Sequence, residues 1–418
     1  MEQIKLKFTL IKNLGMCKWI TIIIMILFSS SVKSEVFEPL IDLSISGGNA
    51  FYEGSPSSFG IDVKGNVGLG VNFTDDIAIL LYYSGGYEGI QQLQTLEEGD
   101  TLTQGSQDHM TVIKYLNNFT DSFILKGKFG YQIVLINETK DETWGKGLYD
   151  HNMANIGLEV ESNKIFSSII NTGYNFYTVL FPNFESLATR LNINEPGQKI
   201  FDYKVNESFV NITTPITTNF NNSFGYTLDA KSYTEQKVII EGGEYSPVLR
   251  QDFVHELYNK INWIPLIISL KGISFGLFDQ CQISLNLSYN LKIYTSNQNY
   301  YDVKQFVFVP NYYDYIKHQL SPTLNFFILP ERISISFLFN FSNSSYRERL
   351  IQDETGFNGV IKMVTNDYTY SISILLPITE FFSGNLLVNL SNVNSNMKYE
   401  QVYKYNYSIA NYCFGIEY

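Results

Sequence analysis

Three pairs of charged residues stand two positions apart, in stretches where apolar residues fill the alternate positions. The pairs are Asp62 and Lys64, Lys126 and Lys128, and Glu159 and Glu161. A β-strand repeats every two residues, so both members of a pair lie on one face and the apolar residues on the other. Charged side chains on a wet face act on passing ions. We therefore expect these six residues to line a water-filled channel; the alternative is a solvated face without selectivity.

A further group of charges is acidic and falls in a stretch that we predict to be a long external loop, Glu88–Asp108. It contains five carboxylates and no lysine or arginine: Glu88, Glu97, Glu98, Asp100 and Asp108. At the mouth of a channel such a loop would raise the local concentration of cations. The alternative is an ordinary solvated loop.

Residues typical of catalysis do not form motifs. Four histidines are scattered along the chain: His109, His151, His255 and His318. None has the sequence context of a Ser-His-Asp triad. The adjacent Asp75 and Asp76 fall in a predicted turn, where aspartate is a turn former. Cys281 and Cys413 stand far apart, which excludes a disulfide framework and disfavours a metal site. We expect no enzyme activity, no metal and no cofactor.

Alternating hydrophobicity is the dominant pattern of the chain. It is longest from Phe59 to Phe73, where only Gly65 interrupts the apolar set, and this exceeds the usual length of a soluble strand. A strand that crosses a membrane at a tilt has this length. A loop rich in Gly, Ser and Pro is predicted before it, at 47–57. Short turns are predicted at 74–76, 120–122, 162–164, 221–222, 279–280, 329–332 and 377–380.

Seven short turns therefore alternate with eight longer loops, which predicts sixteen antiparallel strands. Three regions complicate the count. Val248–Phe278 is too long for one strand, contains Pro265, and changes parity near Lys271, which predicts a bulge. Pro215 and Pro322 fall inside predicted strands, where the missing N–H breaks the ladder. An error in one strand pair would give fourteen or eighteen strands.

Residues 408–418 form a final short strand pattern. Aromatic or apolar residues occupy every second position, namely Ala410, Tyr412, Phe414, Ile416 and Tyr418. This pattern resembles the closing strand of bacterial outer-membrane β-barrels. The resemblance implies that Tyr412, Phe414, Ile416 and Tyr418 form the signal read by the barrel-assembly machinery. Periplasmic chaperones are then expected partners. The apolar set changes parity upstream, so we expect a bulge near Tyr407–Asn411, with the aromatic-rich part beyond it at the outer membrane surface.

The alternation of loop lengths points the same way, because outer-membrane barrels have short periplasmic turns and longer external loops. It predicts an all-β, up-and-down transmembrane barrel with both termini in the periplasm. Composition agrees: aromatic residues are 15% and charged residues only 17% of the chain. This composition favours strands and turns over helices.

The first 34 residues predict a signal peptide. Basic residues precede the apolar run Lys18–Phe28, which is too short for a transmembrane helix of about 20 residues. Cleavage is expected after Ser34, with translation starting at Met1 or Met16, and 35–418 would form one barrel domain. The leader carries a net charge of +4, so the remainder carries −16. Such an acidic body excludes nucleic acid as an expected partner.

These observations predict export through the Sec pathway to the outer membrane and a porin-like channel for passive diffusion of small solutes. Membrane lipid is the expected surrounding, and a homotrimer is compatible with the class. Two alternatives remain open. The first is an adhesin-like or structural barrel with a closed lumen, whose long loops would bind host or surface ligands. The second is a transporter of hydrophobic compounds, as in the fatty-acid transporters, although only Glu35–Pro39 precede the first predicted strand and leave no room for a hatch segment.

Overall fold

The computed structural model describes residues 37–95, 101–137, 142–165, 167–185, 197–269, 280–329, 333–379, 381–399 and 405–418. The predicted signal peptide lies outside the described residues. None of the described residues forms a helix long and apolar enough to span a membrane.

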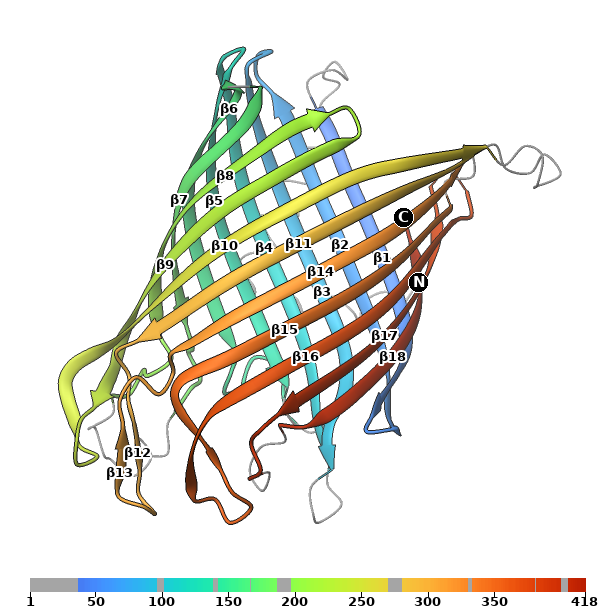
Figure 1. Cartoon of the computed structure of the whole chain (residues 1–418). Coiled ribbons are helices and arrows are strands. Elements are labelled where there is room, and N and C mark those ends of the chain that lie inside the picture. Colours follow the sequence, from blue (N-terminus) through green and yellow to red (C-terminus); the bar gives the residue numbers. More distant parts are fainter. Residues whose placement is uncertain are drawn as a thin grey trace, which may run out of the picture.

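Sixteen strands form one closed antiparallel barrel, in which each strand pairs with its neighbours along the chain and β1 pairs with β18 (Figure 1). The barrel strands are β1 (Phe37–Tyr52), β2 (Ser55–Asn72), β3 (Ile77–Thr95), β4 (Thr101–Thr120), β5 (Phe123–Asn137), β6 (His151–Ile165), β7 (Ser168–Leu180), β8 (Tyr203–Thr217), β9 (Phe220–Ile239), β10 (Tyr245–Ser269), β11 (Gln280–Ser296), β14 (Tyr315–Leu329), β15 (Ile333–Gln352), β16 (Asn358–Pro377), β17 (Ser383–Ser395) and β18 (Tyr407–Glu417). Two short strands, β12 (Tyr300–Asp302) and β13 (Val307–Val309), make a separate hairpin between β11 and β14. The predicted barrel of sixteen strands is confirmed.

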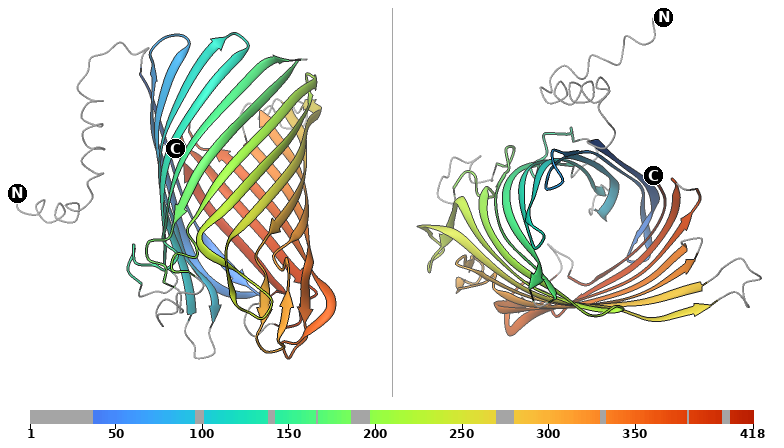
Figure 2. Two further views of the ribbon diagram at one scale, coloured as in Figure 1. Left: turned by 90° about the vertical axis from the view of Figure 1, so that its left-hand side faces the viewer. Right: turned by 90° about the horizontal axis from the view of Figure 1, so that it is seen from above.

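The barrel has two walls because side chains alternate along each strand. Figure 2 shows the closed ring of strands along the barrel axis. On the outer wall Ile41, Val67, Phe129 and Phe414 are exposed apolar side chains. Cross-strand partners face the same side, so the register places Ser46, Asp62 and Gly415 together on the inner wall. Closure pairs both strand edges, as a bilayer requires.

The barrel has a turn end, where β1 begins and β18 ends, and a loop end opposite. At the loop end two predicted loops are wrong. Strands β1 and β2 run through 47–57 and turn at Glu53 and Gly54, both with positive φ. Strand β3 continues to Thr95, and β4 already begins at Thr101. Backbone pairing beyond the apolar belt needs no apolar face, so alternation in the sequence stops before the strands do.

At the turn end two predicted turns are displaced. Strands β6 and β7 turn after Ile165 rather than at 162–164. Strand β9 begins at Phe220, so the predicted turn at Asn221 and Asn222 lies inside it. The prediction is wrong because asparagine, although common in turns, here forms cross-strand hydrogen bonds through both side chains. Asn222 Oδ1 accepts from Asn259 Nδ2 at 3.0 Å, and Asn221 Oδ1 accepts from Asn262 Nδ2 at 2.8 Å.

The prolines in strands coincide with irregular pairing. The register between β10 and β11 shifts between Trp263 and Leu266, on either side of Pro265. The register between β8 and β9 shifts after Pro215. Pairing of β14 with β15 is interrupted between Leu320 and Thr323, where Pro322 lies. The bulge predicted near Lys271 falls outside the described residues.

The bulge predicted near Tyr407–Asn411 is wrong. Strand β18 starts at Tyr407 and pairs without a register shift with both β17 and β1. The change of parity has another cause. Tyr407 shares the inner-wall parity and stacks on Tyr52, with ring centroids 5.9 Å apart, at the loop end of the barrel. An aromatic side chain therefore stands on the inner wall there without any bulge.

Candidate functional site: the charged inner wall

The clearest ionic cluster on the inner wall is the Lys126 cluster, formed by Lys126, Glu159 and Glu161. Lys126 on β5 is the cross-strand partner of Glu159 on β6, so the cluster spans two adjacent strands. Its Nζ lies 2.7 Å from Glu159 Oε1 and 2.6 Å from Glu161 Oε2. All three side chains are partly exposed to solvent, so a pair of this kind adds little to stability. With one lysine and two glutamates, the cluster carries a net charge of −1, which makes the electrostatic potential inside the barrel more negative.

Lys128 lies next to this cluster but has a different neighbour. It stands directly opposite Lys114 in the β4–β5 register, and both lysines are exposed. Within the described part of the chain neither forms an ion pair. Like charges in opposite positions repel one another. A recess of about 310 Å³ opens here, and its lining includes Lys114, Lys126, Lys128, Glu159 and Asn175.

Asp62 and Lys64 lie near the middle of β2. Lys64 Nζ lies 4.0 Å from Glu88 Oε1 on β3, and the two side chains are 61% and 56% exposed. Asp62 Oδ1 accepts a hydrogen bond from the Gly89 N–H at 3.1 Å. Both side chains therefore face the interior of the closed barrel and are still in contact with water.

The acidic residues predicted in an external loop are divided. Glu88 and Asp108 lie in β3 and β4, so their prediction as loop residues is wrong. Glu88 is near Lys64, and Asp108 accepts from Gln132 Nε2 at 2.9 and 2.8 Å. Glu97, Glu98 and Asp100 lie outside the described residues.

Ion pairs continue around the inner wall on strands that the sequence did not single out. Lys292 Nζ lies 2.7 Å from Glu256 Oε1, and Lys317 Nζ lies 4.0 Å from Asp367 Oδ2. Glu207 and Asp229 stand directly opposite one another in the β8–β9 register. The inner wall therefore carries charges of both signs on β5 and β6 and also on β10, β11, β14 and β16.

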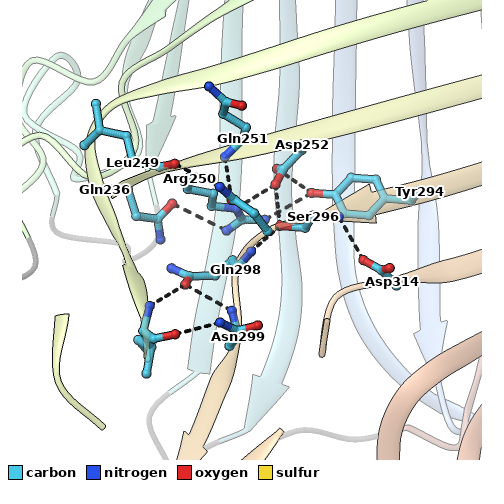
Figure 3. Close-up of polar contacts among 12 residues, drawn as sticks. Gln236, Leu249, Arg250, Gln251, Asp252, Tyr294, Ser296, Gln298, Asn299 and Asp314 are labelled. Carbon is cyan, nitrogen blue, oxygen red and sulfur yellow. Dashed lines mark hydrogen bonds and ion pairs between the residues drawn. The ribbon is translucent and has the colours of Figure 1, made fainter. Parts of the chain in front are cut away.

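A buried polar network, for which no sequence pattern makes a prediction, lies at the loop end of the inner wall. We call it the Asp252 network: Arg250, Asp252, Tyr294 and Ser296 (Figure 3). Asp252 is completely buried. Its Oδ1 accepts from Arg250 Nε at 2.9 Å and from Ser296 Oγ at 2.6 Å, while its Oδ2 accepts from the Tyr294 hydroxyl at 2.5 Å.

Loop residues complete the network from outside the barrel strands. Asp314 Oδ1 accepts from the Ser296 N–H at 2.8 Å, and burial raises the pKa of the Asp314 carboxyl. The Arg250 guanidinium lies over the rings of Tyr233 and Tyr313, at 4.7 and 4.8 Å from their centroids. The network therefore ties β9, β10 and β11 to the segment that carries the β12–β13 hairpin.

Gln298 makes a neighbouring set of contacts. Its Oε1 accepts from the Ile239 N–H at 3.0 Å, and its Nε2 donates to the Lys237 carbonyl at 3.1 Å. Burial also raises the pKa of Tyr312, in the same segment, to about 12. A buried, fully bonded network of this kind fixes geometry, because an unpaired member would be costly.

Among the described residues, no group of three or more His, Cys, Asp or Glu side chains could hold a metal ion. The exposed apolar outer wall and the charged, wet inner wall of a closed antiparallel barrel together define a transmembrane β-barrel protein.

No family model matches the chain, and no curated protein matches its sequence. Solved structures with a similar arrangement include OccK2 (OpdF) of Pseudomonas aeruginosa in complex with glucuronate, at 8% identity and a TM-score of 0.47, covering 91% of this chain and 98% of that one. A trimer form of OmpT, an outer membrane protein of Vibrio cholerae, has 10% identity and a TM-score of 0.46, with 92% and 99% covered. OccAB3 of Acinetobacter baumannii has 7% identity and a TM-score of 0.46, with 91% and 100% covered.

Proposed function

We propose that the protein is a porin-like channel of the bacterial outer membrane, through which small hydrophilic solutes diffuse passively. The observation that carries the proposal is the exposure of Lys64 and Glu88. Their side chains face the interior of a closed barrel and yet are 61% and 56% exposed. A barrel packed with side chains would bury them, whereas a barrel of sixteen strands is wide enough to leave an aqueous channel.

The six residues Asp62, Lys64, Lys126, Lys128, Glu159 and Glu161 are proposed to lie along the path of the solute. In this proposal the protein has no enzyme activity and binds no cofactor. The turn end faces the periplasm and the loop end faces outward, as in outer-membrane barrels. A signal peptide and Sec export bring the chain to this membrane, and a trimer is the proposed assembly.

Conductance in a planar lipid bilayer tests the proposal. The refolded mature barrel should give discrete, ohmic channel openings. A barrel that folds, as judged by heat-modifiable migration in gels, but conducts nothing would overturn the channel and favour a structural or adhesive role. Swelling of vesicles in sugars of increasing size would then give the size limit of an open channel.

A further inference from the structure

One row of cross-strand partners on the inner wall carries two like-charged pairs of opposite sign. The row crosses the adjacent strands β4 to β9, and each of its residues stands directly opposite the next one in the register (Figure 1). In order, the row consists of Lys114, Lys128, Gly157, Asn175, Glu207 and Asp229. Two lysines therefore form one end and two carboxylates the other, with a glycine and an uncharged amide between them.

The lysine end of the row is not compensated by the protein. Lys114 and Lys128 are both exposed, and among the described residues neither has a carboxylate partner. Like charges that stand directly opposite one another destabilise a sheet. Lys292 and Lys317 are also directly opposite one another on the inner wall, but each of them lies within 4.0 Å of a carboxylate. The charge of Lys114 and Lys128 is therefore free to act on a solute.

The carboxylate end has the opposite charge and forms no ion pair within the part of the chain that the structure describes. Asp229 Oδ1 is buried there without a hydrogen-bond partner. The lysines in its neighbourhood have other contacts. Lys231, two residues along β9, lies over a tyrosine ring, 3.6 Å from the centroid, and Lys292 is paired with a glutamate of β10 at 2.7 Å. A cationic group brought in by a solute would give Glu207 and Asp229 the partner that they lack.

The middle of the row is hollowed. The recess of about 310 Å³ includes Lys114, Lys128, Gly157 and Asn175 in its lining. Gly157 leaves room there, because a Cβ at this position would collide with Asn175 Oδ1. Asn175 Nδ2 donates to Glu207 Oε1 at 2.5 Å and so connects the recess to the carboxylate end. The other charged residues of the lining belong to the Lys126 cluster and are paired with one another.

We propose that this row binds short zwitterionic peptides inside the channel. The peptide carboxylate lies on Lys114 and Lys128, and its ammonium lies on Glu207 and Asp229. Strands β5 and β8 are three strand spacings apart, which is about 14 Å along the wall. The two ends of an extended dipeptide are about 7 Å apart, and each charge-assisted hydrogen bond adds about 3 Å. The assignment rests on the proposed function, because the solute reaches the row through an open lumen.

Saturation-transfer NMR of the refolded mature barrel, in uncharged detergent at pH 7 and low salt, tests the site with glycylglycine. N-acetylglycylglycine, which lacks the ammonium, and glycylglycinamide, which lacks the carboxylate, should each bind at least about fivefold more weakly. Lys128→Met and Glu207→Gln should each weaken the binding of glycylglycine about fivefold, the upper range for one exposed ion pair. Lys317→Met is the matched control, since it removes an opposed lysine that already has a carboxylate partner, and it should leave binding unchanged.

Equal affinity of the unmodified barrel for glycylglycine and its two blocked forms would overturn the site, whether or not the variants fold. Equal losses in Lys128→Met and Lys317→Met would do the same, since any inner-wall lysine would then suffice. The channel is judged separately by conductance. A barrel that conducts but does not prefer glycylglycine overturns the site alone. A barrel that binds glycylglycine selectively but does not conduct overturns the channel and leaves the row as a binding site.

Discussion

The Lys126 cluster and the Asp252 network are both built on a basic residue and a carboxylate of the inner wall, yet their surroundings differ. Lys126, Glu159 and Glu161 are partly solvated, and water can replace any one of them. Asp252 is completely buried and Arg250 is only 12% exposed, and both carboxylate oxygens of Asp252 accept hydrogen bonds. The first arrangement can act on solutes at little cost to folding, whereas the second stabilises the loop end and is closed to solutes.

The largest expected effect is that of Asp252→Ala. The substitution leaves the Arg250 charge, the Tyr294 hydroxyl and the Ser296 hydroxyl without their carboxylate partner. Breaking a buried ion pair from one side costs about 3–5 kcal/mol of the free energy of unfolding. Urea unfolding of the barrel in lipid vesicles, followed by aromatic fluorescence, measures this loss. Lys126→Ala is the control, and an equal loss in both variants would remove the distinction between the two clusters.

Ser296→Ala removes one hydroxyl from the Asp252 network and is expected to have the next largest effect. The hydroxyl donates to the buried Asp252 carboxylate at 2.6 Å, and a hydrogen bond to a charged group contributes about 1.5–3 kcal/mol. Ser321→Ala is a matched control, because Ser321 Oγ donates at 2.6 Å to the neutral Asn340. This control should lose about 1 kcal/mol in the same unfolding experiment. A larger loss for Ser321→Ala than for Ser296→Ala would contradict the role of the buried charge.

Lys126→Met should change permeation more than stability. Removing the cation leaves Glu159 and Glu161 uncompensated, with an expected cost in unfolding free energy below about 1 kcal/mol. One charge about 10 Å from an ion in water alters the energy of that ion by about 0.4 kcal/mol, a factor of about two. Because this energy change has opposite signs for cations and anions, the cation-to-anion permeability ratio should rise about fourfold, as measured by the reversal potential in a salt gradient. Glu161→Gln should shift the reversal potential the opposite way, and an unchanged potential in both variants would place the cluster off the solute path.

Lys64→Gln is expected to have the smallest effect. Its ion pair with Glu88 spans 4.0 Å between exposed side chains, so the unfolding free energy should change by less than about 0.5 kcal/mol. The same urea titration measures it. A loss as large as that of Ser296→Ala would mean that Lys64 is held in a drier environment than its exposure indicates.

The same comparison explains what could be predicted from the sequence. The Lys126 cluster lies on the two strands β5 and β6, where alternation alone fixes which side chains share a face. The Asp252 network joins Arg250 to Tyr294 and Ser296, which come from the next strand more than forty residues later. No local pattern specifies that pairing. The number of strands was predictable because each membrane crossing shows apolar alternation in the sequence. The strand ends beyond the apolar belt show no alternation, so their positions were not predictable.

Turn chemistry was the other source of error. Asn221 and Asn222 are residues typical of a turn, but their side-chain amides form hydrogen bonds with Asn262 and Asn259 on the adjacent strand β10. In a chain this rich in asparagine, the same residue type marks turns in one place and cross-strand ladders in another. Only the neighbouring strand decides between them, and the register with that strand is a tertiary property.

The seam between β1 and β18 also constrains how the molecule is made. Tyr418 N–H donates to the Leu43 carbonyl at 2.8 Å, and Leu43 N–H donates back to Tyr418 at 3.2 Å. These partners stand at opposite ends of the described chain, so the ring closes only after every intervening strand is in place. Until then the two outermost strands carry free edges, which invite pairing with other chains. Assembly must therefore protect two distant edges at the same time, and a barrel missing its final strand would be an aggregation hazard rather than a smaller barrel.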